Sequence, residues 1–213
     1  MDKHIYDENT KTLKINPLFN EKIENISKEI EIIDFSGHYI NNNFIKSKFN
    51  QSIDNLPDNI IKIIFDFTST FNQPINKLPI NLTYLYFVGK FNQPLDNLPN
   101  NLICVNLGDD FNYPLDNLPK SLTQLYLGRC FNYPLDNLPN SLIHLEFSTN
   151  SHYNNKLNNL PTNLNYLCFG SKYKKIFDNI PLSLKTIIMI NAKQKKLLKK
   201  IPLETVIKIK NYK

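Results

Sequence analysis

The sequence predicts a solenoid, with a single curved parallel β-sheet, one short strand in each repeat of 20–22 residues, and an extended or 3₁₀ convex side. Three observations support this fold class. The motif F-N-x-P-L-x-N-L-P recurs along most of the chain, six apolar positions recur with it, and prolines separate the strand-like segments. A period of this length is typical of solenoids, in which each repeat contacts only its neighbours.

The repeat occurs in eight copies, and each copy opens with an aromatic residue. The motif is clearest in FNYPLDNLPKSL at 111–122 and FNYPLDNLPNSL at 131–142. One copy alone cannot bury enough apolar surface to offset the entropy of ordering its backbone, so each copy must present the same face to the next. The copies start at Phe19, Phe49, Phe71, Phe91, Phe111, Phe131, Tyr153 and Tyr173.

Each copy predicts one strand and one return segment. The segment LTQLYL at 122–127 ends in a period-two alternation of apolar and polar residues, which indicates a strand. Proline cannot donate a backbone hydrogen bond to a ladder, so FNYPLDNLP at 111–119 must lie off the sheet. The apolar positions should form the core, and in this copy they are Phe111, Leu115, Leu118, Leu122, Leu125 and Leu127.

Asparagine occupies two further positions of the repeat, represented by Asn112 and Asn117. An amide side chain both donates and accepts hydrogen bonds, so we expect these residues to satisfy backbone groups of successive turns. Gly108, Gly128 and Gly170 recur directly after strands, where we expect turns to require them.

The predicted organisation is an N-terminal cap at 1–18, eight repeats at 19–193, and a partial repeat with a basic C-terminal cap at 194–213. The net charge is +6, and the charge is concentrated in KYKK at 172–175 and KQKKLLKK at 193–200. Lysines at a terminal repeat prevent end-to-end strand addition. They also suit nucleic acid or an acidic protein, and both interpretations stay open.

Composition limits the class of protein. Hydrophobic content of 41% and aromatic content of 12% favour a folded chain. No apolar run is long enough to span a bilayer, and the N-terminus lacks the apolar core of a signal peptide. Cys104, Cys130 and Cys168 have no CxxC spacing, which fits a reducing compartment and argues against a disulfide scaffold or a zinc site. We therefore expect an intracellular, cytoplasmic monomer.

Two columns of outward-facing strand residues vary from copy to copy and form the predicted binding surface. Tyrosine among mixed polar residues suits protein recognition, although strand propensity alone also favours tyrosine at such positions. The loops at 36–48, 66–70, 148–152 and 190–193 vary in length along one edge, which is a second candidate surface. The candidate protein-binding residues are Tyr84, Tyr86, Asn106, Gln124, Tyr126, His144, Glu146 and Tyr166.

The sequence shows no catalytic constellation. His144 and Glu146 are two residues apart on one predicted strand, where they stand side by side without a nucleophile or a closed pocket. No metal-ligand spacing and no glycine-rich phosphate loop is present. We therefore expect a non-enzymatic protein with no metal and no cofactor.

The copies at 91–102, 111–122 and 131–142 resemble FNIP repeats, a short variety of leucine-rich repeat found in social amoebae and in giant DNA viruses that infect amoebae. The resemblance extends from residue 19 to about residue 190. It implies a leucine-rich-repeat-like solenoid whose outward strand columns face the concave surface, and it implies an interaction role, with a host protein of an amoeba as one candidate partner. It supplies no catalytic residues.

Some proteins of this family carry an F-box, which would make them substrate receptors of ubiquitin ligases. Only 18 residues precede Phe19, too few for that helical module, so such a role would need a separate subunit. The function that we predict is protein–protein interaction through the concave strand face. The alternatives are binding of nucleic acid or an acidic partner through the lysine-rich C-terminus, and a ubiquitin-ligase receptor acting through a separate subunit.

Overall fold

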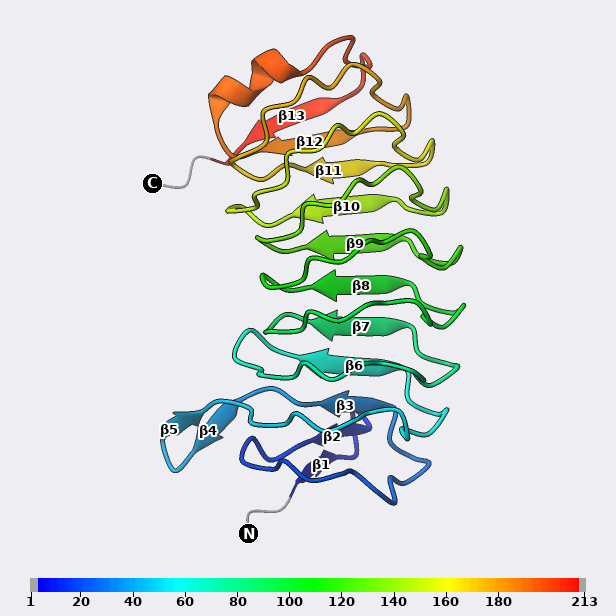
Figure 1. Cartoon of the computed structure of the whole chain (residues 1–213), viewed down its shortest axis with the longest axis vertical. Coiled ribbons are helices and arrows are strands. Elements are labelled where there is room, and N and C mark those ends of the chain that lie inside the picture. Colours follow the sequence, from blue (N-terminus) through cyan, green and yellow to red (C-terminus); the bar gives the residue numbers. More distant parts are fainter. Residues whose placement is uncertain (1–3, 211–213) are drawn as a thin grey trace.

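The protein is a parallel β-solenoid in a computed structural model that describes residues 4–210. Figure 1 shows the strands stacked along the long axis of the molecule, with the connecting segments on both sides of the stack. One sheet contains 11 strands in chain order. They are β1 (Ile5–Asp7), β2 (Thr12–Lys14), β3 (Ile32–Asp34), β6 (Lys62–Phe65), β7 (Tyr84–Phe87), β8 (Cys104–Leu107), β9 (Gln124–Leu127), β10 (His144–Phe147), β11 (Tyr166–Cys168), β12 (Thr186–Met189) and β13 (Val206–Ile209).

The strand pairing confirms the prediction of one strand per repeat. From β2 to β13 every neighbouring pair is parallel and in register, so that Leu85, Val105 and Leu125 occupy one row across three strands. The sheet is larger than the nine strands expected from the repeats. The difference arises because β1 and β2 form an antiparallel hairpin that adds two strands before the first repeat.

The recurring apolar positions form one continuous core. Phe111, Leu122 and Leu125 are fully buried, whereas Leu118 is only partly buried against the core. The opening aromatic residues stack on one another, and the ring centroids of Phe91 and Phe111 are 6.3 Å apart with nearly parallel planes. A side chain in each turn therefore packs on its equivalent in the next, as the repeated sequence predicts.

The return segments contain turns and extended chain. In each of eight turns the backbone N–H of the strand-entry residue bonds to the carbonyl of a proline three residues earlier, as between Leu122 and Pro119 at 3.1 Å. All prolines of the chain lie outside the strands, as predicted. Within residues 4–210 helix is confined to the 3₁₀ helix η1 (Ala192–Leu197). No described helix is long and apolar enough to cross a membrane.

An asparagine ladder runs along the return segments and confirms the role predicted for the Asn112 position. The N–H of Asn112 donates to the side-chain oxygen of Asn92 at 2.9 Å, and the N–H of Asn132 donates to that of Asn112 at 3.0 Å. The same bond recurs in every turn from Asn20 to Lys174. The second asparagine position behaves differently, since Asn137 donates from its amide to the side chain of Asp116.

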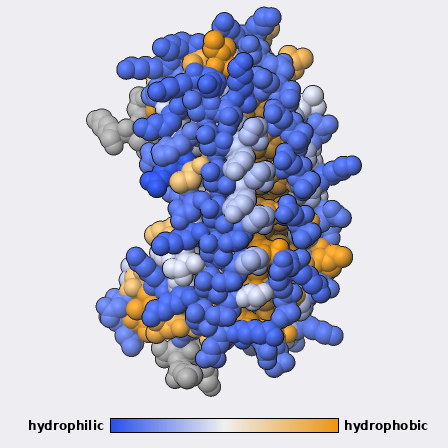
Figure 2. All heavy atoms as spheres, in the orientation of Figure 1, coloured by the Kyte–Doolittle hydropathy of each residue, from blue (hydrophilic) through white to orange (hydrophobic). Residues whose placement is uncertain are grey.

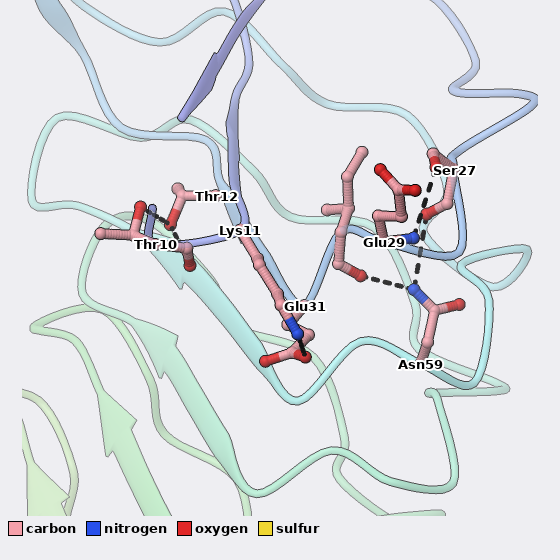
Figure 3. Close-up of polar contacts among 8 residues, drawn as sticks. Thr10, Lys11, Thr12, Ser27, Glu29, Glu31 and Asn59 are labelled. Atoms are coloured by element: carbon pink, nitrogen blue, oxygen red, sulfur yellow. Dashed lines mark hydrogen bonds and ion pairs between the residues drawn. The ribbon is translucent and has the colours of Figure 1, made fainter. Parts of the chain in front are cut away.

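A third polar position also links the turns, and the sequence analysis missed it. Ser121 donates from its hydroxyl to the carbonyl of Leu102 at 2.7 Å, and Asn101 donates from its amide to the carbonyl of Ile80 at 3.1 Å. Figure 3 shows the first of these bonds, from Asn59 to the preceding turn, beside the ion pair between Lys11 and Glu31. Because Ser and Asn reach different carbonyls, this position shows no single residue type in the sequence.

The predicted loop at 36–48 contains a hairpin, β4 (His38–Ile40) and β5 (Asn43–Ile45), which projects from the side of the solenoid (Figure 1). Asn41 and Asn42 form its turn with φ of 48° and 64°, a region in which asparagine is favoured. Tyr39 and Phe44 are exposed with ring centroids 5.3 Å apart. Figure 2 shows hydrophobic residues gathered over this part of the molecule.

Gln194 closes the C-terminal end of the aromatic column. It occupies the position of the opening aromatic residue in the partial ninth repeat, and its side chain is 4% exposed. Its amide donates to the carbonyl of Gly170 at 2.8 Å, and its oxygen accepts from the N–H of Ile190 at 3.0 Å. A polar side chain is stable there because it satisfies backbone groups that have no partner in the next turn.

Candidate protein-interaction face

The outward side of the sheet, which we call the strand face, contains two columns of side chains from β3 to β13. Strand register places Tyr84, Gln124 and His144 in one column and Tyr86, Tyr126 and Glu146 in the other. Most of these side chains are partly exposed, whereas the residues between them point into the core. All eight candidate residues therefore lie on one face, on the five consecutive strands β7 to β11.

Aromatic rings cluster on β9, β10 and β11. The ring of His144 stacks on that of Tyr166, with centroids 4.1 Å apart, and packs at 4.9 Å against Tyr126 on its other side. The Nε2 atom of His144 lies 3.1 Å from the Oε2 atom of Glu146, so the two side chains stand side by side on one strand, as predicted. Tyr126 donates from its hydroxyl to Gln124 at 3.3 Å. These contacts hold the side chains in fixed positions.

A second cluster lies on β6 and β7. The ammonium group of Lys62 lies over two tyrosine rings, 5.0 Å from the centroid of Tyr86 and 5.8 Å from that of Tyr84. Cation–π contacts of this length are attractive. Lys62 was not among the candidate residues, because its position beside Tyr84 follows from the pairing of β6 with β7 and not from spacing along the sequence.

Cys104 and Cys168 lie on the strand face but are buried, at 1% and 2% exposed. Cys104 lies beside Tyr86, whose hydroxyl interacts with it. Burial raises the pKa of the Cys104 thiol above its usual value and that of Cys168 to about 12. Both thiols therefore stay protonated at neutral pH and are poor nucleophiles.

Burial also raises the pKa of the Tyr86 and Tyr126 hydroxyls above the usual tyrosine value. Both groups are therefore neutral at physiological pH and can donate or accept hydrogen bonds. Within residues 4–210 no three His, Cys, Asp or Glu side chains lie close enough together to hold a metal ion. The strand face offers aromatic surface, neutral hydrogen-bonding groups and the carboxylate of Glu146, which are features of a recognition surface.

Sequence reasoning missed two exposed aromatic features beside this face. Phe67, just after β6, is 78% exposed, and the β4–β5 hairpin carries Tyr39 at 72% exposed. Both lie in loops that the sequence analysis identified only by their variable length. The signal that could have identified the hairpin is the Asn41–Asn42 pair, since adjacent asparagines favour a tight turn.

Comparison with a known structure supports the fold. The chain is similar to the crystal structure of CroV588, described as a novel circular leucine-rich-repeat protein and belonging to a giant virus. The TM-score is 0.77 with 29% sequence identity, and the similarity covers 98% of this chain and 31% of that chain. The chain thus spans less than a third of the length of that protein. No curated protein matches the sequence.

The stack of parallel strands and this similarity define the class of protein as a leucine-rich-repeat-like solenoid. Within that class the chain carries FNIP repeats, since the family model for the FNIP repeat matches residues 71–110 and 111–150. The same core columns continue on both sides of the matched residues, from Phe49 to Tyr173. The resemblance found in the sequence is therefore confirmed.

Proposed function

We propose that the chain is a non-enzymatic interaction module that binds a partner protein through the strand face. The observation that supports this most directly is the register of the strands, which gathers tyrosines, amides, His144 and Glu146 on one continuous surface. Repeat folds of this class are generally used for binding, and tyrosine provides a large contact area at low entropic cost.

The rigidity of this surface favours binding. Each of the strands β7 to β11 is hydrogen-bonded to two neighbours, and the asparagine ladder fixes the return segments behind them. A preorganised surface loses little conformational entropy when a partner binds. The ring contacts of His144 with Tyr126 and Tyr166 hold three of the candidate side chains before any partner arrives.

The test is the combined substitution Tyr84→Ala, Tyr126→Ala and Tyr166→Ala. Proteins captured by the wild-type chain are identified, purified, and titrated against both forms. We expect the triple variant to bind at least about 100-fold more weakly, a loss of about 2.7 kcal/mol, because truncating even one central tyrosine of an interface often costs about 2 kcal/mol or more. Thermal unfolding should change little, because these side chains lie outside the core.

The control carries Tyr6→Ala and Tyr133→Ala, which remove two exposed tyrosines outside the candidate set. It should bind as tightly as the wild type. A third variant, Tyr39→Ala with Phe44→Ala, removes the exposed hairpin aromatics. Unchanged binding by the triple variant, or loss of binding only in the hairpin variant, would exclude the strand face as the site.

The lysine-rich C-terminus is a second candidate surface, for nucleic acid or an acidic protein. Lys174, Lys193 and Lys196 line one hollow beside η1, which gathers charge from two separate segments. Binding of a generic RNA or DNA at low salt would support it, provided that affinity falls steeply as salt increases and that the substitution of these three lysines by glutamine weakens it. Absence of binding at low salt would exclude nucleic acid.

A further inference from the structure

A hollow of about 250 Å³ lies beside the strand face where β8, β9 and β10 end. Asn106, Tyr126 and Glu146 line it from the second outward column, and Gly108 and Gly128 line it from the loops that directly follow β8 and β9. We call it the Gly108 hollow. Most small-molecule pockets measure about 300–1,000 Å³, so the hollow suits a single side chain of a larger partner.

The glycines of the hollow are required by the close approach of successive loops. A Cβ atom at Gly128 would lie 2.1 Å from the carbonyl oxygen of Gly108, and one at Gly108 would lie 2.2 Å from that of Val88. Neither glycine has a positive φ, so a turn conformation is not the reason, contrary to the expectation from sequence. Close stacking of the loops therefore excludes side chains at these two positions, and their backbone lines the hollow together with Tyr126.

The hollow is acidic. Glu146 and Asp109 are among its lining residues, and none of its described lining residues is lysine or arginine. Arg129, the neighbouring cation in the loop, donates its backbone N–H to Asp109 at 2.9 Å, but it is not among the residues that line the hollow. A carboxylate has about four lone-pair sites, so the contact with His144 leaves Glu146 able to accept further hydrogen bonds.

Aromatic rings accompany the carboxylates. Tyr126 on β9 and the exposed Phe67, just after β6, both line the hollow. The same strand face already holds one cation against aromatic rings, where Lys62 lies over Tyr84 and Tyr86. Aromatic surface with carboxylates attracts a planar cation through stacking and charge-assisted hydrogen bonds.

From these contacts we infer that the Gly108 hollow binds an arginine side chain of the partner protein. Its guanidinium group donates to Glu146 and Asp109, and its aliphatic part and planar face pack against Tyr126 and Phe67. Arginine is favoured over lysine because it donates in a fixed fork and stacks on aromatic rings, whereas the lysine ammonium is more strongly hydrated. This inference rests on the proposed function, since it names the chemistry that the strand face recognises.

The experiment titrates the full-length chain, labelled with ¹⁵N, with three small probes while amide chemical shifts are recorded. The probes are N-acetyl-arginine methylamide, its lysine counterpart and its citrulline counterpart, which has nearly the shape of arginine without the charge. We expect the arginine probe to bind in the millimolar range and to shift the amides of Asn106, Gly108 and Gly128. The citrulline probe should leave them unchanged, and the lysine probe should bind more weakly.

Two variants localise the binding. Glu146→Gln keeps the side-chain shape and should weaken binding of the arginine probe about tenfold, because a hydrogen bond to a charged group is lost. Glu204→Gln removes an exposed carboxylate that does not line the hollow and should change nothing. The inference is wrong if the arginine probe does not shift these amides, or if the citrulline or lysine probe binds as tightly as the arginine probe. It is also wrong if Glu146→Gln and Glu204→Gln bind the arginine probe equally tightly.

The outcome separates this inference from the proposed function. Glu146→Gln retains all three tyrosines of the triple variant, so partner binding that survives Glu146→Gln but is lost in the triple variant supports the strand face and rejects the arginine contact. The reverse outcome is that the arginine probe binds at the hollow while the triple variant binds the partner as tightly as the wild type. That outcome would show that the hollow binds arginine and that the strand face is not the partner site.

Discussion

The side-chain oxygen of Asn112 accepts a hydrogen bond from the backbone N–H of Asn132, which lies 3.0 Å away on the next turn. The N–H of Asn112 is bound in the same way to Asn92 on the preceding turn. Each asparagine is therefore a link that receives one bond and provides the next. The sheet joins the turns on one side of the core, and this ladder joins them on the other.

We predict that Asn112→Ala lowers the free energy of unfolding by about 1 kcal/mol, because the N–H of Asn132 loses its acceptor at a site that water can reach. Asn112→Asp keeps an acceptor oxygen and should lose less. Urea unfolding followed by circular dichroism measures both. Lys174→Ala is the control, since Lys174 ends the ladder and contributes only its backbone N–H. An equal loss in the Asp and Ala variants would contradict the role of the acceptor.

We predict that Gly128→Ala destabilises the protein by about 1–3 kcal/mol, the usual cost of forcing extra atoms into a packed site. The added Cβ would lie 2.1 Å from a backbone oxygen that cannot move without displacing the loop of Gly108. The free energy of unfolding in urea measures the effect. Ser148→Ala is the matched control, because Ser148 occupies the corresponding position after β10 and already carries a Cβ. A change within about 0.5 kcal/mol for Gly128→Ala would show that the loops are less tightly stacked.

The repeat explains why so much of the fold was predictable. An apolar residue recurs at the position of Leu125 in every copy, because each copy packs against a neighbour of the same kind. Alignment of the eight copies therefore identifies the core positions, as an alignment of homologues would. Strand register then follows, and with it the grouping of Tyr84, Tyr126 and Tyr166 on one face. Features present once, such as the β4–β5 hairpin and the first strands, have no such repetition and were not found.

Contacts between side chains of neighbouring turns were harder to predict than the column in which each residue lies. Cys104 occupies an outward column yet is buried, because it is a small residue that lies beside Tyr84 on the neighbouring strand and against the hydroxyl of Tyr86. Gly128 follows a strand, which suggests a turn, but its contact with Gly108 shows that close stacking is the reason. The spacing of a residue within the repeat predicts the column in which it lies. Its contacts depend on the size of the side chains on the adjacent strands, which the spacing does not give.

We predict that one thiol of the native protein reacts readily with a disulfide reagent at pH 8. Cys130 is partly exposed, whereas Cys104 and Cys168 are buried with raised thiol pKa values, so little reactive thiolate forms at those two positions. Absorbance of the released thiolate should report one equivalent quickly and three after unfolding in guanidinium. Cys130→Ser should remove the fast phase. Rapid reaction of two or more thiols in the native protein would show that the strand face opens.

We predict that Tyr153→Phe stabilises the protein by about 1 kcal/mol, or about 2–4 °C in Tm for a chain of this size. The Tyr153 hydroxyl is buried in the aromatic column and has no hydrogen-bond partner among the residues that the structure describes. Phenylalanine fills the same position in the preceding copies and leaves no unsatisfied polar atom. Phe131→Tyr is the reverse control, and it should destabilise the protein by placing a hydroxyl in the same column.

The same residue sets a pH dependence, because burial raises the pKa of Tyr153 above the ordinary value of about 10. The folded state therefore holds this proton more tightly than the unfolded state. The free energy of unfolding is therefore independent of this group below about pH 10, and it decreases as the pH rises above that value towards the folded pKa, because the unfolded state loses the proton first. Unfolding measured between pH 8 and 11 should show a steeper alkaline loss for the wild type than for Tyr153→Phe, and parallel curves would place the hydroxyl in contact with solvent.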